Sequence, residues 1–315
     1  MNIIFTLLLF IIGLIMIVKG GDWFLDSTVW IAEKTGVSFG IIGATIVSVA
    51  TTLPELLVST LSSKGGFTDM AVGNALGSYI CNIAFIVGLC VLIKPIKIKD
   101  DFFGVKGAMM FGYLAIFYYF ASDGVINHIE GKMLLLLVIP FILINIFEHK
   151  NENGNGKKRL KKDIKKKELC LNAGKFAIGA FFIVYGAHIL VKTGVEIANF
   201  LRIPKQVVSL TLLAVGTSLP ELVTAVSATI KDKQNISVGN IIGANILNMT
   251  IVMGASSLVS SGGLIISNQT LTLDVPMGTI VALIFILVGT FYEKIGRITG
   301  ILLLALYIGY LFILF

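Results

Sequence analysis

Long apolar stretches joined by short polar segments are the feature that most restricts how this chain can fold. A helix needs about 20 mainly apolar residues to cross the hydrocarbon core of a bilayer. Ten such stretches lie approximately at 2–20, 38–63, 69–93, 104–122, 129–147, 173–192, 204–230, 236–260, 275–292 and 297–315. The sequence lacks the alternating ten-residue pattern that is typical of a membrane barrel. We therefore predict an all-α membrane protein with ten transmembrane helices.

The composition excludes a soluble globular domain. Only 14% of the residues are charged and 56% are hydrophobic, whereas a soluble domain carries about 25% charged residues. The apolar stretch 3–18 is expected to be a retained helix rather than a cleaved signal peptide, because no basic region precedes it and Lys19 follows it. Lipid is thus the expected surroundings of most of the chain.

The positive net charge is concentrated in one segment. Nine of the 25 Lys and Arg residues lie in 150–167, which predicts a basic cytoplasmic loop over 149–171 rather than a nucleic-acid partner. The remaining basic residues near helix ends then fall mostly on the cytoplasmic side, with Lys192, Arg202 and Lys205 as the exceptions. This orientation predicts a multi-pass protein of the cell membrane with both termini outside the cytoplasm.

The chain contains two copies of one unit. A spacing of 166 residues relates Glu55 to Glu221 and Pro54 to Pro220. It also relates Thr51 to Thr217, Gly73-Asn74 to Gly239-Asn240, Gly77 to Gly243, Asn82 to Asn248, Gly88 to Gly254, Gly13 to Gly179 and Gly20 to Gly186. Each copy holds five predicted helices, so the second copy must enter the membrane from the opposite side. We therefore predict inverted repeats at 1–148 and 172–315, an arrangement typical of secondary transporters.

The two repeated glutamates are the strongest candidates for an ion site. Glu55 and Glu221 lie in the middle of apolar stretches, where an ionised side chain costs at least about 2.5 to 3.5 kcal/mol. A protonated or salt-bridged structural role is the alternative, but the middle of neither stretch contains a basic partner. Two symmetric carboxylates favour a cation site.

Oxygen-bearing side chains surround these glutamates at helical spacing. Residues three and four apart share a helix face, which groups Ser48, Thr51, Thr52, Glu55 and Ser59 into one stripe and Asn74, Ser78 and Asn82 into another. Such oxygens suit hard cations like Ca2+ and Na+. Asn82 and Asn248 are further candidate ligands through their amide oxygens.

Proline adds possible backbone ligands. Pro54 and Pro220 are expected to open their helices around Ala50 and Gly216 and to free the carbonyls of Ser48 and Ala214. A simple kink is the alternative, and the Gly-Asn-x-x-Gly segments serve equally well for close helix packing. We expect interrupted helices at 38–63, 69–93, 204–230 and 236–260 to form the central site. Nucleotide-binding, catalytic-triad and zinc motifs are missing, so neither an enzyme nor a cofactor is predicted.

These motifs resemble those of a known family. Ala50-Thr-Thr-Leu-Pro-Glu-Leu56 and Gly216-Thr-Ser-Leu-Pro-Glu-Leu222, each followed by Gly-Asn-x-x-Gly, are similar to the alpha-repeats of the sodium/calcium exchangers within the cation/calcium exchanger superfamily. The resemblance implies that Glu55 and Glu221 bind Ca2+, with help from the carbonyls of Thr51 and Thr217. The resemblance further implies that sodium uses Thr51, Thr52, Ser78, Thr217, Ser218 and the carbonyls of Ser48 and Ala214. Asn82 would complete the centre.

The resemblance implies Na+/Ca2+ antiport by alternating access, without a cofactor and in a monomer. H+/Ca2+ antiport at the same two glutamates is the alternative, and a cation channel is a third hypothesis. Two positions depart from the sodium-coupled pattern, because Ala244 stands where Ser is common and Asn248 stands where Asp is common. We expect these two positions to affect the coupling to sodium more than the binding of calcium.

Overall fold

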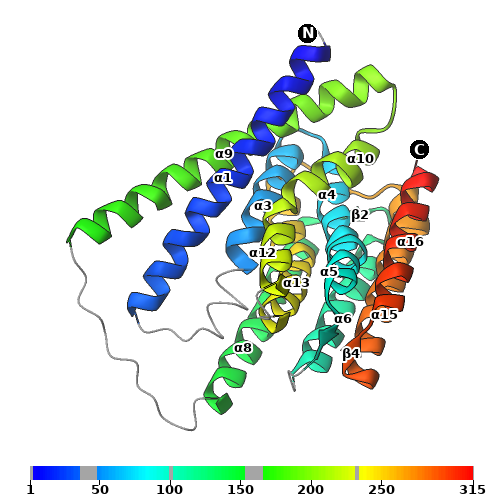
Figure 1. Ribbon diagram of the computed structural model, residues 1–315. Coiled ribbons are helices and arrows are strands. Elements are labelled where there is room, and N and C mark those ends of the chain that lie inside the picture. The colour runs from blue at the N-terminus through cyan, green and yellow to red at the C-terminus, as the bar shows by residue number, and fades with distance from the viewer. Residues whose placement is uncertain (1–2, 36–47, 99–101, 153–165, 231–233, 315) are drawn as a thin grey trace.

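The protein is a helical bundle whose members run mostly along one common direction (Figure 1). The computed structural model describes residues 3–35, 48–98, 102–152, 166–230 and 234–314. In the first half these form α1 (Ile3–Thr35), α3 (Ser48–Lys64), α4 (Thr68–Ile80), η2 (Cys81–Val87), α5 (Gly88–Ile93), β1 (Ile96–Lys97), α6 (Phe103–Ala121), β2 (Val125–Ile126), α7 (His128–Leu136) and α8 (Val138–Glu152). The label η marks π-helical turns.

The second half repeats this order. Its elements are α9 (Lys166–Leu201), α10 (Lys205–Val208), η4 (Ser209–Leu213), α11 (Ala214–Thr217), α12 (Leu219–Ile230), α13 (Gln234–Leu247), η5 (Asn248–Val252), α14 (Met253–Val259), β3 (Leu264–Ile265), η6 (Thr270–Asp274), α15 (Val275–Tyr292), β4 (Lys294–Ile295) and α16 (Arg297–Leu314). The predicted boundary segment 149–171 is partly helical, since α8 ends at Glu152 and α9 begins at Lys166. Residues 153–165 of that segment lie outside the described residues.

The described helices agree with the predicted multi-pass membrane fold. Eight of them are long and apolar enough to cross a bilayer, and a ninth span arises if the pair Lys205–Thr217 and Leu219–Ile230, bent by 43°, is counted as one. The predicted span 38–63 is described only from Ser48 onward, as α3. These ranges are consistent with ten spans.

Helices α1 and α9 are longer than the sequence suggested. The predicted stretches were 2–20 and 173–192, whereas α1 contains 33 residues and α9 contains 36. The predicted ends were therefore wrong, because hydropathy marks where a helix leaves the apolar layer and not where the helix itself stops. The two helices pack side by side and extend beyond the rest of the bundle (Figure 1).

Glycines at the crossing of α1 and α9 reveal the symmetry of the two halves. A Cβ added to Gly20 would lie 2.8 Å from the Gly179 carbonyl oxygen, and one added to Gly186 would lie 2.9 Å from that of Gly13. The repeat spacing relates Gly13 to Gly179 and Gly20 to Gly186, so both contacts join the same two repeat positions. A two-fold relation between the halves produces such a reciprocal contact, and it confirms the inverted repeats.

The same reciprocity links the ends of the bundle. Antiparallel β1 pairs with β4, with Ile96 opposite Ile295, and β2 pairs with β3, with Ile126 opposite Leu264. Each small sheet therefore takes one strand from each half. Both chain termini and β2 lie at one end, here called the termini end, and β4 lies at the opposite end (Figure 1). The halves interlock, so neither is a separate compact unit.

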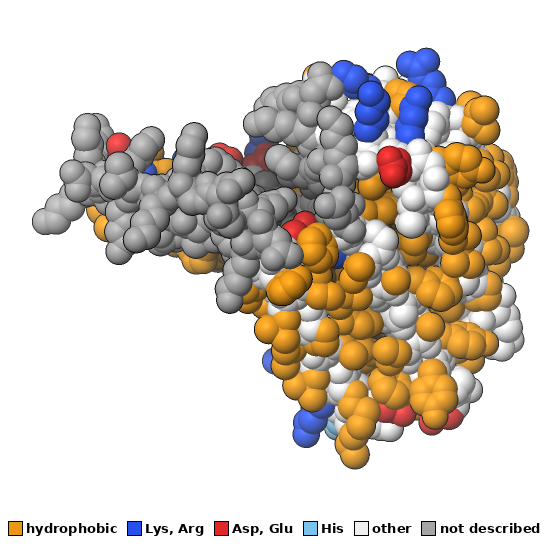
Figure 2. All heavy atoms as spheres, turned by 90° about the horizontal axis from the view of Figure 1, so that it is seen from below, with side chains coloured by type: hydrophobic (Ala, Val, Ile, Leu, Met, Phe, Trp, Pro, Cys, Tyr) orange, Lys and Arg blue, Asp and Glu red, His pale blue; other side chains and the backbone are white. Residues whose placement is uncertain are grey.

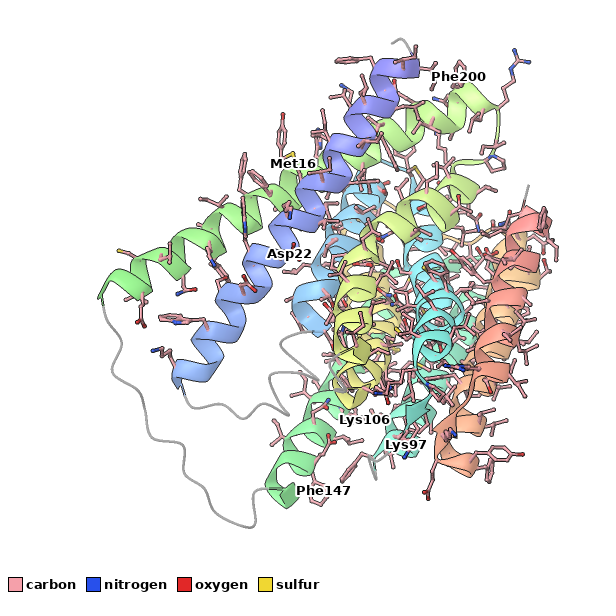
Figure 3. The ribbon with its side chains drawn as sticks, in the orientation of Figure 1. Met16, Asp22, Lys97, Lys106, Phe147 and Phe200 are labelled. Carbon is pink, nitrogen blue, oxygen red and sulfur yellow. The ribbon has the colours of Figure 1, made fainter. Side chains whose placement is uncertain are left out.

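The surface of the bundle suits a lipid environment. Figure 2, which looks at the bundle from below relative to Figure 1, shows hydrophobic side chains over much of the described surface, with Lys and Arg side chains mainly at its edges. Phe147 and Phe200, labelled in Figure 3, are 59% and 61% exposed. In contrast, most residues of α4, η2, α13 and η5 are buried, which places the polar motifs of the repeats at the centre of the molecule.

Candidate cation-binding site

The residues proposed as ligands are all buried in the centre of the bundle. The eleven positions are Ser48, Thr51, Thr52, Glu55, Ser78, Asn82, Ala214, Thr217, Ser218, Glu221 and Asn248, and the most exposed of them is only 4% exposed. They come from α3, from α4 and η2, from the α11–α12 junction and from η5. Burial of so many polar groups is costly unless partners satisfy them.

Glu55 receives hydroxyl groups from both halves of the chain. The Ser218 hydroxyl donates to Oε1 at 3.1 Å, and the Ser78 hydroxyl donates to the same oxygen at 3.4 Å. The second oxygen, Oε2, has no hydrogen-bond partner among the described residues. Helix α3 of the first half and the α11–α12 junction of the second half therefore meet at this carboxylate.

Glu221 is hydrogen-bonded less well than Glu55. Within the described part of the chain, neither of its carboxylate oxygens has a hydrogen-bond partner. The repeat explains part of this difference, because Ala244 occupies the position equivalent to Ser78 and has no hydroxyl. Thr52, the equivalent of Ser218, also keeps a buried hydroxyl without a partner in the ranges that the structure describes. Three of the four carboxylate oxygens are thus left to bind something else.

Threonine and asparagine side chains cross between the halves in equivalent pairs. The Thr51 hydroxyl donates to the Asn240 Oδ1 at 3.4 Å, and the Thr217 hydroxyl donates to the Asn74 Oδ1 at 3.3 Å. These two threonines are repeat equivalents, as are the two asparagines. The crossed pairs place the pseudo-two-fold axis between the two Leu-Pro-Glu-Leu segments.

Backbone carbonyls lie beside the same hydroxyls. The Thr51 hydroxyl is 3.4 Å from the Ser48 carbonyl oxygen, and the Thr217 hydroxyl is 3.3 Å from that of Ala214. The Ser78 hydroxyl approaches the Ala214 carbonyl at 3.5 Å. The Ser48 and Ala214 carbonyls, two of the four that were predicted as ligands, therefore belong to the same polar cluster as the hydroxyls.

Asn82 and Asn248 lie in equivalent π-helical turns. Asn82 belongs to η2, and Asn248 begins η5. The Asn82 amide donates to the Asn245 Oδ1 at 3.0 Å, but the Asn82 Oδ1 and both polar atoms of Asn248 have no partner in the described ranges. A π-helical turn widens the helix and often occurs at functional sites, so it interrupts the spans 69–93 and 236–260 without a proline.

The proline-containing spans behave differently from each other. In the second half, Ser218 (φ −82°, ψ 6°) separates α11 from α12, two residues after the expected opening at Gly216. In the first half, α3 continues through Pro54. The expected opening around Ala50 is therefore wrong for the described part of this span, Ser48–Lys64. A proline removes one hydrogen bond, but the packing around it decides whether the helix bends.

Three asparagines contribute more than the sequence analysis proposed. The sequence groups Asn74 with Ser78 and Asn82 in one polar stripe and relates Asn240 to Asn74 through the repeat spacing, but neither is among the eleven predicted ligands. Asn245 binds Asn82 and also donates to the Tyr79 carbonyl at 3.3 Å. Its repeat equivalent is Tyr79, so the repeat offered no signal for this role.

The chemistry of the centre fits a hard cation. Its polar atoms are carboxylate, hydroxyl, amide and carbonyl oxygens, which are the ligands that Ca2+ and Na+ prefer. Among the described residues, no group of three or more His, Cys, Asp and Glu side chains is placed to hold a metal ion. Two carboxylates supply the charge that balances one divalent cation, and the ligand role of each residue stays a prediction.

Comparison with known proteins identifies similar membrane proteins. A family model described as sodium/calcium exchanger protein matches residues 5–147 and 171–315. The sodium/calcium exchanger MaX1 of Methanosarcina acetivorans is 31% identical over 345 residues, covering 98% of this chain and 98% of MaX1. The inner membrane protein YrbG of Escherichia coli is 31% identical over 314 residues, covering 98% of this chain and 96% of YrbG.

Solved structures show the same arrangement of helices. The structure of the sodium-calcium exchanger NCX_Mj soaked with 2.5 mM Na+ and 0.1 mM Ca2+ matches with a TM-score of 0.70 at 31% identity. The match covers 97% of this chain and 97% of the other chain. A structure of the same exchanger soaked without Na+ and Ca2+ matches with a TM-score of 0.67.

Proposed function

This chain belongs to the sodium/calcium exchanger family, and on that premise we propose that it exchanges Ca2+ for Na+ across the cell membrane by alternating access. Members of this family are transporters and not enzymes. The observation that carries the proposal is the pair of buried carboxylates, of whose four oxygens three have no hydrogen-bond partner among the described residues. A transported cation would offset the cost of burying these charges.

Calcium is proposed to bind between Glu55 and Glu221. Their two charges neutralise one Ca2+, and the carbonyls of Thr51 and Thr217 add neutral oxygens. Asn82 and Asn248 support this assignment, because their amide oxygens are buried and unpaired in the described part of the structure. Calcium accepts six to eight oxygen ligands in flexible geometry, which a centre assembled from four helical segments can provide.

Sodium is proposed to use the hydroxyl groups around the calcium position. The proposed ligands are Thr51, Thr52, Ser78, Thr217, Ser218 and the carbonyls of Ser48 and Ala214. Ser78 and Ser218 contact Glu55, so this side of the centre combines hydroxyls with a negative charge. Ala244 offers no hydroxyl on the equivalent side, which makes a sodium site there weaker.

Exchange of Ca2+ for protons is the second candidate. The observation that favours it is the environment of Glu221, whose two carboxylate oxygens have no hydrogen-bond partner in the described ranges. A carboxylate in such a place can accept a proton in exchange for Ca2+. The two candidates share the same calcium ligands and differ in the counter-ion.

The proposal includes the arrangement in the membrane. The repeats 1–148 and 172–315 would form the two halves of a monomeric transporter, with the segment 149–171 in the cytoplasm and both termini outside. Support comes from the basic residues of that segment and from the position of both termini at one end of the bundle (Figure 1).

A flux experiment tests the counter-ion. Protein reconstituted into liposomes should take up 45Ca2+ when a sodium gradient of opposite direction is applied, and much less with a proton gradient alone. Full uptake driven by protons without sodium would replace the first candidate by the second. Acceleration by the counter-ion from the opposite side, without conductance in planar bilayers, separates both from a channel.

A further inference from the structure

Asp274 is a second buried carboxylate that the central site does not use. It ends η6, directly before α15, and its side chain is 0% exposed. The Tyr310 hydroxyl donates to its Oδ1 at 2.9 Å, and the Gln206 amide donates to its Oδ2 at 3.0 Å. The Gln269 amide donates to Oδ1 at 3.4 Å. All three donors are neutral.

These hydrogen bonds join three elements that are distant in sequence. Tyr310 lies on α16, Asp274 at the start of α15, and Gln206 on α10. The Gln206 amide also donates to the Thr270 hydroxyl at 2.8 Å, so two side chains of η6 hold it. Helix α10 is the start of the predicted span 204–230 and lies toward the termini end of the bundle (Figure 1). The hydrogen bonds of Asp274 therefore connect the start of this span to α15 and α16.

The span that begins with α10 also carries Glu221, and its helix is irregular at two places. Its backbone is π-helical over Ser209–Leu213, and it bends by 43° between Lys205–Thr217 and Leu219–Ile230. The segment before the bend can therefore turn relative to the segment that carries Glu221, as is typical of helices interrupted near a transport site. The hydrogen bonds from Gln206 to Thr270 and Asp274 therefore limit the turning of this segment.

This segment also packs closely against α4. The carbonyl oxygen of Gln206 would lie 3.0 Å from a Cβ on Gly73, so the backbone of α10 lies close against a glycine of α4. Hydrogen bonds from the Ser209 hydroxyl to the Met70 carbonyl, 2.6 Å, and from Gln206 to Asp274 hold the segment in place. The carboxylate makes the latter contact charge-assisted and stronger than a neutral hydrogen bond.

We propose that Asp274 is a positioning residue that latches α10 to α15 and α16 and thereby restrains opening of the central site at the termini end. The role in opening the central site rests on the proposed transport function. The hydrogen bonds of Asp274 to Gln206 and Tyr310 are contacts within the protein and do not depend on that function. Asp274 acts through Gln206 on the position of a helix and is not proposed to touch the transported ion.

Thiol labelling tests the latch without any ion gradient. Val208 is 1% exposed at the end of α10, and a Val208→Cys variant in a Cys170→Ser background reports on access to this segment. We expect Asp274→Asn to raise the rate of labelling by a membrane-impermeant thiol reagent at least tenfold in liposomes. Tyr310→Phe, which keeps the carboxylate and removes one donor, should raise it about threefold.

Tyr307→Phe is the matched control, because Tyr307 is buried on the same helix and its hydroxyl is not one of the donors to Asp274. It should leave the labelling rate unchanged, and all variants should keep the half-saturating Ca2+ concentration within twofold. Unchanged labelling in Asp274→Asn would overturn the proposal. So would a tenfold shift in calcium half-saturation without faster labelling, since Asp274 would then act on the ion site. Failure of sodium-driven uptake alone would count only against the proposed function.

Discussion

The clearest test of the candidate site is the replacement Glu221→Gln. The change removes one of two buried negative charges and keeps the size of the side chain. Removing one partner from a buried charge pair costs about 3 to 5 kcal/mol, which corresponds to a loss of about two to four powers of ten in calcium affinity. Glu55→Gln should weaken calcium binding by a similar factor.

Glu221→Gln and Glu55→Gln should differ in stability when calcium is absent. Gln at 221 removes a charge that has no hydrogen-bond donor among the described residues, whereas Gln at 55 weakens two charge-assisted bonds from Ser218 and Ser78. Hydrogen bonds to charged groups contribute about 1.5 to 3 kcal/mol each, and those at 3.1 and 3.4 Å belong at the lower end. We expect Glu221→Gln to be more stable than Glu55→Gln in chelator by about 1 to 2 kcal/mol.

Thermal unfolding of the purified protein in detergent measures both effects. Calcium at a hundred times its dissociation constant stabilises the native protein by about 2.7 kcal/mol, and a hundredfold weaker site reduces this to about 0.4 kcal/mol. Glu196→Gln is the control, because Glu196 lies on α9 and accepts a hydrogen bond from Thr6 at 2.8 Å. A normal calcium-dependent shift in Glu221→Gln would remove the ligand assignment. A less stable Glu221→Gln than Glu55→Gln in chelator would refute the argument from asymmetry.

Three further changes probe other parts of the molecule. Ala244→Ser should lower the sodium concentration needed for half-maximal exchange at least threefold while calcium half-saturation stays within twofold; identical sodium curves would show that the missing hydroxyl is harmless. Gly20→Val should destabilise the protein by about 1 to 3 kcal/mol, because its Cβ would lie 2.8 Å from the Gly179 backbone. Denaturation in SDS measures this loss of stability. Gly112→Ala should show no such loss, because its Cβ would meet no described atom within 4 Å. Lys106→Met leaves the partly buried carboxylate of its 2.5 Å partner Glu148 without this cation (Figure 3 labels Lys106) and should cost about 1 to 3 kcal/mol. The added change Glu148→Gln should restore part of this stability, and no recovery would argue against the ion pair as the cause.

The two glutamates proposed to bind calcium could be singled out from the sequence because two independent patterns coincide on them. A carboxylate inside an apolar span is costly, and a second one at the same repeat position makes an accidental placement improbable. The spacing of 166 residues also related Asn82 to Asn248 and Thr51 to Thr217. All of these side chains are buried in the same central region.

Other features of the centre depended on contacts that no local pattern encodes. Ser218 and Glu55 are 163 residues apart, and Thr51 and Asn240 are 189 apart. The repeat equivalent of Asn245 is Tyr79 and not a second amide, so neither spacing nor symmetry marked it. The course of the two proline-containing helices could not be predicted from their sequences either. Helix α3 is continuous whereas the α11–α12 junction is bent, although both contain the same Leu-Pro-Glu-Leu segment, because their surroundings differ.

The sequence by itself determined that this chain enters a membrane, that it consists of two inverted copies and that each copy contributes one glutamate to a polar centre. These properties follow from hydropathy, helix number and duplication, which are local or additive along the chain. Only the tertiary structure decided which oxygens face each carboxylate, where each helix is interrupted and that Asp274 joins α10 to α15 and α16. Those features arise where helices from distant parts of the chain cross, and the geometry of a crossing depends on both partners at once.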